Sequence, residues 1–262
     1  MKYPTFNPSA NQELSFPPDA SKRILEATLG SWGVETALRY TSFGALSTHL
    51  TRFVMGPIFV WHPSDDWEAR LSISNAANDQ LWVAAVRECW PSGGIDTFLN
   101  HVHTPCRKMI DVGRNGASLY LDDLHDAEHE FEFGTGGPLL CAAKELATGE
   151  VSLMSRHRSF PFETLGNDAA QFVCHAERMP REGVWGIRWV KSKAVSVLCV
   201  TEVKTRTAVA DGMAYLEARE HIPGVRAFRD VCLALGVRPY LDSAELYPSG
   251  RIDMTLGILG PE

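Results

Sequence analysis

The sequence predicts an α+β protein of two tandem, pseudo-symmetric units of about 120 residues, each an antiparallel sheet with one short helix and one helix broken by proline. Three observations predict this fold. Segments rich in β-branched and aromatic residues indicate strands in each half, apolar residues at helical spacing indicate helices, and one strand-turn-strand outline occurs twice. We therefore predict an extended arm over residues 1–18, a first repeat over residues 19–138 and a second repeat over residues 139–262.

The recurring outline spans residues 118–138 and 238–261. Both copies contain Tyr-Leu-Asp, which ends at Asp122 in the first copy and at Asp242 in the second. The pattern Trp-x-x-Arg also occurs in both halves, beginning at Trp67 and at Trp185. Because the order of the expected elements agrees as well, these matches favour an internal duplication over chance.

In the first half, the proline-rich arm precedes a short helix that begins after Asp19 and ends at Gly30. Apolar and β-branched residues then predict strands over residues 34–43, 53–62, 67–74 and 80–89. Apolar residues at helical spacing predict a helical stretch from Ile95 to Gly113, interrupted at Pro105.

In the second half, the spacing of apolar residues after Pro138 predicts a helix over residues 139–147. Strands are expected over residues 170–178, 184–190 and 194–203, and a helical stretch over residues 213–235, interrupted at Pro223. Arg188 lies three residues after Trp185, so the two side chains should lie on opposite faces of their strand. We expect Trp185 in the core and Arg188 on the surface, paired with an acidic residue of a neighbouring strand such as Asp242.

Composition excludes several classes of protein. With 45% hydrophobic and 22% charged residues, the 262-residue chain can bury a core without disulfides. Its net charge of −7 argues against nucleic-acid binding, which relies on clustered Lys and Arg, and favours a basic protein partner or a small molecule. No apolar run is long enough for a membrane span or a signal peptide, so we expect a cytoplasmic protein without membrane contact. The six cysteines show no C-x-x-C spacing and are expected to be reduced.

An acidic stretch near the middle of the chain is the most prominent candidate site. Three interpretations are open: a solvated strand face, a docking patch for a basic partner, or a metal site. The second copy of the hairpin lacks the histidines of the first, so we predict no metal and no cofactor. The candidate partner-binding residues are Asp122, Asp123, Asp126, Glu128, Glu130 and Glu132.

Four histidines are candidate catalytic residues. His49 and His157 each begin a His-x-Ser/Thr tripeptide, a pattern that would suit a two-histidine phosphoesterase if the two imidazoles converge. His103 and His221 are paired by the repeat, each two residues before a proline. They would either line a cleft between the halves or bond the last carbonyls of a helix.

The sequence lacks the fingerprints of the common hydrolases, metalloproteases and dinucleotide-binding enzymes. It therefore favours a non-enzymatic protein that masks or escorts a basic partner, in the manner of an immunity protein or a chaperone. The alternative is a small-molecule enzyme or ligand-binding protein with a cleft between the two repeats, using His103, His221, Asp122 or Asp242. The two-histidine phosphoesterase is a further alternative.

Overall fold

The structure is a computed structural model, and it describes part of the 262-residue chain. The described residues are 54–61, 67–74, 79–91, 94–102, 106–113, 116–122, 124, 131, 138–180, 183–201, 206–218, 220–221, 223–236 and 238–259. The predicted arm, the helix from residue 19 and the strand over residues 34–43 lie outside this part.

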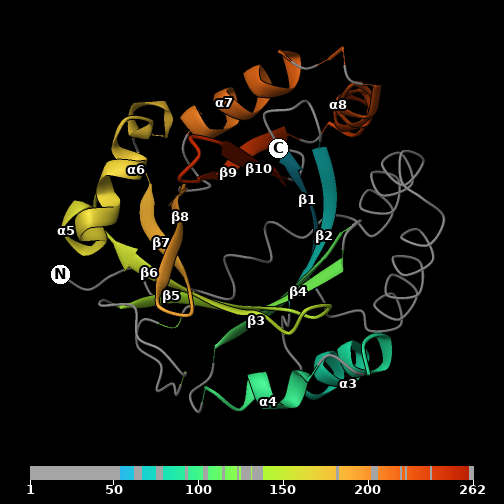
Figure 1. Ribbon diagram of the computed structural model, residues 1–262. Helices are drawn as coiled ribbons and strands as arrows, with labels where there is room; N and C mark the ends of the chain where they lie inside the picture. The colour runs from blue at the N-terminus through green and yellow to red at the C-terminus, as the bar shows by residue number, and fades with distance from the viewer. Residues whose placement is uncertain are drawn as a thin grey trace.

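The strands of the described residues form one closed antiparallel barrel, which Figure 1 shows end-on. Around the barrel the order is β1-β10-β9-β8-β7-β6-β5-β4-β3-β2. The strands are β1 (Val54–Trp61), β2 (Trp67–Ser74), β3 (Arg107–Gly113), β4 (Gly116–Asp122), β5 (Leu139–Glu145), β6 (Val151–His157), β7 (Val184–Val190), β8 (Lys193–Val200), β9 (Arg238–Leu246) and β10 (Ile252–Leu259).

Helices lie outside the barrel and follow the second strand of a hairpin (Figure 1). They are α3 (Asp79–Cys89), α4 (Ile95–Leu99), α5 (Phe162–Leu165), α6 (Ala170–Val173), α7 (Arg206–Glu217) and α8 (Pro223–Leu235), with the short 3₁₀ turns η3 (Gly166–Ala169) and η4 (Ala176–Arg178). The short turns that join β3 to β4, β5 to β6, β7 to β8 and β9 to β10 therefore share one end of the barrel, which we call the hairpin end.

Two hydrophobic clusters fill the space between the barrel and its helices. Trp82 of α3 and Phe98 of α4 pack with Leu119 and Leu121 of β4. Phe172 of α6 packs in a second cluster with outward side chains of β7 to β10, such as Ile187. Burial of these apolar side chains against the outer face of the sheet is the main force that holds the helices in place.

The α+β class and the antiparallel pairing are confirmed, and several elements lie where the sequence predicts them. β1, β2, β7 and β8 match predicted strands, while α4, α7 and α8 match predicted helices. Pro223 is the first residue of α8, where its missing N–H costs no helical hydrogen bond.

Four elements were predicted with the wrong type. Residues 80–89 form the helix α3 rather than a strand, and residues 170–178 are helical rather than extended. Conversely, β3 and β5 were predicted as helices. In β5, residues 141–143 are all buried, because helices cover the outer face of the strand and its other face lies inside the barrel. A strand buried on both faces loses its alternation and resembles a helix in sequence.

The structure does not show the predicted tandem duplication. The repeat pairs Pro105 with Pro223, yet the chain from Arg107 forms strand β3, whereas Pro223 opens helix α8. Strands of both predicted repeats belong to the same barrel, since β4 pairs with β5 and β1 pairs with β10.

Candidate functional site

Strand alternation gives the barrel an apolar outer face and an interior that holds charged and polar side chains beside a small apolar cluster of Cys141, Met154 and Leu198. On β4, Leu119 and Leu121 face the helices, so Ser118, Tyr120 and Asp122 face the interior. The same rule places other polar side chains inside, where their strand neighbours belong to the outer clusters. They include Arg107 of β3, Arg188 of β7, Ser196 of β8, and Tyr240, Asp242 and Glu245 of β9. On β9 a β-bulge at Asp242 interrupts the alternation, so that Asp242, hydrogen-bonded to Tyr240, and Glu245 lie on the same side although they are three residues apart.

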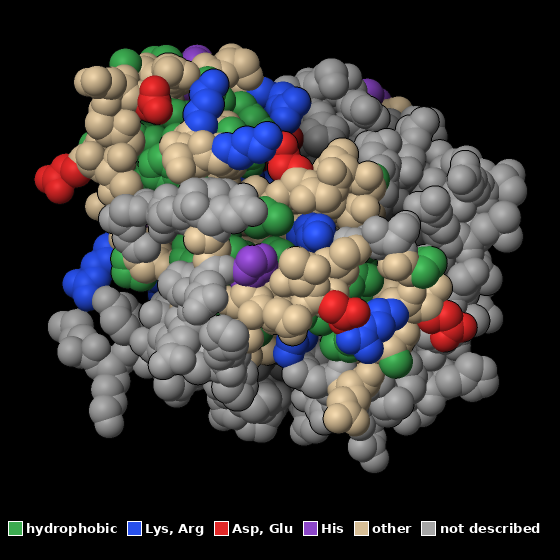
Figure 2. Space-filling model, turned by 60° about the horizontal axis from the view of Figure 1, so that its bottom comes forward, with side chains coloured by type: hydrophobic (Ala, Val, Ile, Leu, Met, Phe, Trp, Pro, Cys, Tyr) green, Lys and Arg blue, Asp and Glu red, His purple; other side chains and the backbone are tan. Residues whose placement is uncertain are grey.

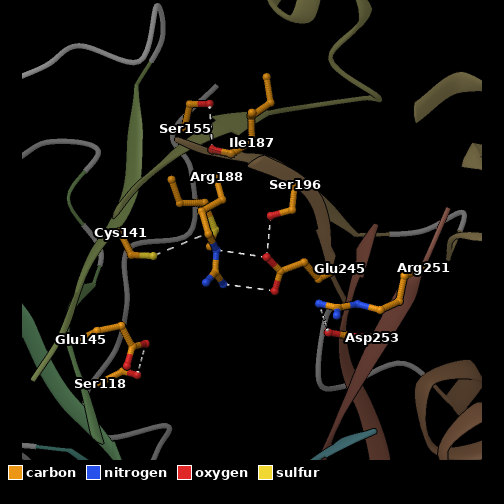
Figure 3. A network of polar contacts seen from close by, with 11 residues as sticks. Ser118, Cys141, Glu145, Ser155, Ile187, Arg188, Ser196, Glu245, Arg251 and Asp253 are labelled. Carbon is orange, nitrogen blue, oxygen red and sulfur yellow. Dashed lines mark hydrogen bonds and ion pairs between the residues drawn. The ribbon is translucent and has the colours of Figure 1, made fainter. Parts of the chain in front are cut away.

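An ion pair connects β7 and β9 in the interior, as Figure 3 shows. Nη2 of Arg188 donates to Oε2 of Glu245 at 3.2 Å, while Nε lies 3.1 Å from Oε1. The hydroxyl of Ser196 donates to Oε1 of the same carboxylate at 2.5 Å. Burial tends to lower the pKa of Arg188, but the Glu245 carboxylate outweighs it, so the pKa is raised and the guanidinium stays charged.

A second ion pair lies nearer the other end of the barrel. Arg107 of β3 pairs with Asp122 of β4, the residue opposite it in the register. On β9, the hydroxyl of Tyr240 donates to Oδ1 of Asp242 at 3.3 Å. Burial raises the pKa of Asp242, and the Tyr240 hydrogen bond and the Arg107 charge offset part of this effect.

Charge interactions across the barrel show that these groups face one another. β4 lies opposite β9, with β5 to β8 between them on one side and β10, β1, β2 and β3 on the other. Even so, Asp122 on β4 contributes to the raised pKa of Asp242 on β9. Tyr120 on β4 likewise acts on Arg188 of β7. Such interactions cross the interior, because the strands that carry these groups are not neighbours.

Aromatic side chains complete the interior surface. Burial raises the pKa of both Tyr240 and Tyr247, so both phenols are neutral at physiological pH. Gly257 of β10 pairs with Tyr240, and a Cβ on Gly257 would lie 2.4 Å from Cζ of the tyrosine ring. Glycine at this position therefore provides the space that the Tyr240 ring occupies.

The hairpin end of β9 and β10 carries its own cation. Arg251 lies over the Tyr247 ring, with the guanidinium carbon 4.0 Å from the ring centroid. It also pairs with Asp253 of β10 at 3.1 Å. The Arg251 side chain is 47% exposed, whereas that of Asp253 is 5% exposed, so this pair connects the rim of the barrel to its interior.

Several interior side chains keep contact with solvent. The exposed fraction is 31% for Arg107, 26% for Arg188 and about half as much for their carboxylate partners. Charged side chains within a barrel that keep accessible surface can contact a small molecule. The guanidinium groups suit anions, the carboxylates suit protons or cations, and the phenol rings suit flat or cationic groups. Interior groups with shifted pKa values are also typical of functional sites.

The structure separates the residues predicted from sequence. Asp122 and Asp242 both lie in the barrel interior, whereas His221 is exposed in the turn before α8. His157 lies on the outer face, where its Nε2 is 2.9 Å from the hydroxyl of buried Ser155, and burial lowers its pKa. Seven candidates lie outside the described residues: His49, His103, Asp123, Asp126, Glu128, Glu130 and Glu132.

The prediction that Arg188 lies on the surface and pairs with Asp242 is wrong. Trp185 does lie on the opposite face, in the outer cluster, but the other face of β7 is the barrel interior. Arg188 therefore pairs with Glu245. Sequence reasoning missed Arg107 and Glu245 as site residues. The sequence signal for Glu245 was its place between two apolar residues, Ala244 and Leu246. In the structure both of these are fully buried on the outer face.

Asp122 does not present an exposed docking surface, because its side chain is 16% exposed and bound to Arg107. On the face shown in Figure 2, basic and acidic side chains of the described residues are interspersed, and neither gathers into one patch. Within the described ranges, no group of three His, Cys, Asp or Glu side chains is arranged to hold a metal ion. No helix in this part of the chain has the length and apolar character needed to cross a membrane.

No protein-family model matches the chain, and no curated protein matches it by sequence. Solved structures do share the fold. One is a 6-dimethylallyltryptophan synthase from Micromonospora olivasterospora in complex with DMASPP and Trp. It aligns with a TM-score of 0.55 at 13% identity, over 98% of this chain and 100% of that one. A second 6-dimethylallyl tryptophan synthase aligns with a TM-score of 0.51 at 12% identity, over 91% and 94%.

These comparisons contradict the prediction of a non-enzymatic masking or escorting protein. The similar structures are enzymes that act on small molecules, and a protein partner finds no support in them. The alternative drawn from the sequence, a small-molecule enzyme or ligand-binding protein, fits the fold better, with the polar barrel interior in place of a cleft between two repeats. At this level of identity, what the chain shares with these synthases is the barrel fold.

Proposed function

We propose that the protein is a small-molecule transferase that moves a dimethylallyl group from a diphosphate donor to an indole-type aromatic acceptor inside the barrel. The observation that carries the proposal is the interior of the barrel, where guanidinium, carboxylate and phenol groups converge from non-neighbouring strands. The fold agrees with it, because the similar structures are dimethylallyltryptophan synthases, one of them bound to DMASPP and Trp.

The donor's diphosphate would bind to the interior arginines. A guanidinium has five N–H donors, and Arg188 directs only its Nε and Nη2 edge at Glu245. Within the described part of the chain no other partner is seen for the remaining donors, and we assign them to phosphate oxygens, to which arginine binds with charge-assisted hydrogen bonds. Glu245 and Ser196 fix the orientation of Arg188, and Asp122 does the same for Arg107. These two arginines would bind the leaving group and stabilise its charge as the allylic bond breaks.

The tyrosines would surround the allylic carbon. A developing allylic cation is stabilised by the faces of aromatic rings, which also exclude water that would otherwise capture it. Tyr120, Tyr240 and Tyr247 suit this role because all three act on charged interior groups or lie beside them. Neutral phenols do not themselves compete as nucleophiles in the way that phenolates would.

A direct assay tests this proposal. Purified protein is incubated with dimethylallyl diphosphate and a panel of indole acceptors that includes tryptophan, and products are identified by mass spectrometry. We expect an acceptor to gain one dimethylallyl group. Absence of transfer to every acceptor, with intact donor recovered, would contradict the proposal.

A matched pair of variants locates the activity. Arg188→Gln with Glu245→Gln removes the interior ion pair without changing the net charge, and should lower transfer by about 100-fold or more. Arg229→Gln with Glu220→Gln makes the same exchange in an ion pair outside the barrel, beside α8, and should leave transfer unchanged. Equal loss in both double variants would show that the barrel interior is not the site.

A further inference from the structure

We propose that Asp242 accepts the proton that the aromatic acceptor loses during transfer, with Tyr240 holding its carboxylate in position. This inference rests on the proposed function and assigns the step that the interior arginines cannot perform. A guanidinium binds the leaving diphosphate, but the ring proton needs a base, because arginine stays protonated in proteins.

Asp242 differs from Asp122 and Glu245 in its surroundings. Asp122 pairs with Arg107, and Glu245 binds both Arg188 and Ser196. Oδ1 of Asp242 accepts a hydrogen bond from Tyr240. Within the described part of the chain, no guanidinium contacts the Asp242 side chain, and no donor lies within hydrogen-bond distance of Oδ2. A base needs a carboxylate oxygen that no cation occupies, and Oδ2 of Asp242 meets this requirement within the described part of the chain.

Neighbouring residues and residues across the barrel both surround the Asp242 side chain. Asp242 occupies a β-bulge of β9, and its hydrogen bond to Tyr240 holds the two side chains together, while Gly257 on β10 makes room for the Tyr240 ring. Asp122 and Arg107 act on Asp242 from across the barrel. An acceptor ring between β4 and β9 would therefore have the donor-binding arginines and Asp242 within the same enclosed space.

The charge state of Asp242 supports the same role. Burial raises its pKa, which strengthens it as a base relative to an ordinary aspartate. The Tyr240 hydrogen bond and the Arg107 charge act in the opposite direction and lower the pKa, which favours the carboxylate form.

The reaction balances without a further reagent. The bond between the allylic carbon and the diphosphate oxygen breaks, and its electron pair leaves with the diphosphate. A ring carbon of the acceptor supplies the electron pair of the new carbon-carbon bond. The proton on that carbon passes to Oδ2 of Asp242, its bonding electrons restore the aromatic ring, and the carboxylic acid then releases the proton to water.

The test compares Asp242→Asn and Asp242→Glu with the parent protein in the transfer assay over a range of pH. We expect Asp242→Asn to lower transfer by about 100-fold or more, the usual effect of losing a general base, while dimethylallyl diphosphate binds as in the parent. Asp242→Glu should restore part of the rate. Asp230→Asn, an exchange on the exposed face of α8, is the control and should have no effect.

The pH profile separates a base from a merely structural residue. Tyr240→Phe removes the hydrogen bond that lowers the pKa of Asp242, so the acidic limb of the profile should move to higher pH. Thermal melts show whether each variant is folded. If Asp242→Asn does not fold, the shift of the acidic limb in Tyr240→Phe tests whether Asp242 is the base. An unchanged rate in folded Asp242→Asn, or an unchanged limb in Tyr240→Phe, would overturn the inference and leave the proposed function standing. A parent protein that transfers nothing would overturn both.

Discussion

At the scale of single residues, the interior carboxylates differ by their partners rather than by their type. Asp122 and Glu245 each bind a guanidinium, while Asp242 binds the hydroxyl of Tyr240. Burial without a bound cation disfavours the charged form, which is why the pKa of Asp242 is raised. On this ground we propose that Asp122 and Glu245 orient arginines and that Asp242 exchanges a proton.

The raised pKa of Asp242 predicts a pH-dependent stability. The folded state holds a proton on Asp242 more tightly than the unfolded state does, so this group favours folding at low pH. Its contribution is lost as pH rises from the ordinary aspartate pKa through the raised one. An asparagine at this position cannot ionise, so the Asp242→Asn variant avoids the destabilisation that the charged carboxylate causes at neutral pH. We expect its melting temperature at neutral pH to be about 2–4 °C higher, the shift that about 1 kcal/mol produces in a protein of this size. Melts recorded from acidic to neutral pH check this, and a parent and variant with parallel profiles would contradict it.

Part of the candidate site could be predicted at this scale. The recurring Tyr-Leu-Asp tripeptide drew attention to Asp122 and Asp242, and both lie in the interior. Arg188 was expected on the surface because strand alternation shows only that two side chains lie on opposite faces. Which face is the interior depends on closure of the barrel, and alternation on one strand does not contain that information.

At the scale of elements, β9 is the strand that joins the site to the outer layer. It carries Tyr240, Asp242 and Glu245 inward, and α7 packs closely against its outer side. Gly212 of α7 permits this close approach, since a Cβ at that position would lie 2.8 Å from Cα of Tyr240. The position of the helix thus determines the position of the strand that bears the proposed base.

Gly212→Ala tests this dependence. Alanine should stabilise a helix by about 1 kcal/mol relative to glycine, but forcing a methyl group against the backbone costs about 1–3 kcal/mol. We expect a net loss of stability together with lower transfer activity, because Tyr240 and Asp242 move with β9. Ala214→Gly, at an exposed position of the same helix, measures the propensity effect alone. A Gly212→Ala variant more stable than the parent would contradict the close packing.

Two kinds of element show what the sequence reveals and what it hides. The amphipathic helices α7 and α8 have one polar side, so their period is visible in the sequence. β5 is buried from outside and inside, and its apolar residues then follow no period of two. In α3, residues typical of strands are helical because Trp82 and Val86, four residues apart, both bury completely against the barrel.

At the scale of the whole molecule, the sequence predicted two similar units, and the structure has one closed barrel. Each predicted half contains strands that need partners, and the pairs β4–β5 and β1–β10 supply them across the expected boundary. Closure removes the exposed sheet edges and creates an enclosed interior. Long-range pairing of this kind leaves no local signal, which is why the site was expected in a cleft between repeats.

In the proposed function, the barrel interior is the binding site for the donor. A crystal structure of the protein with saturating dimethylallyl diphosphate and tryptophan tests this claim most directly. We predict the diphosphate inside the barrel, within hydrogen-bond distance of Arg188 or Arg107, and the indole ring near Asp242. A donor bound among the outer helices, or an interior without bound donor at saturating concentration, would contradict the account.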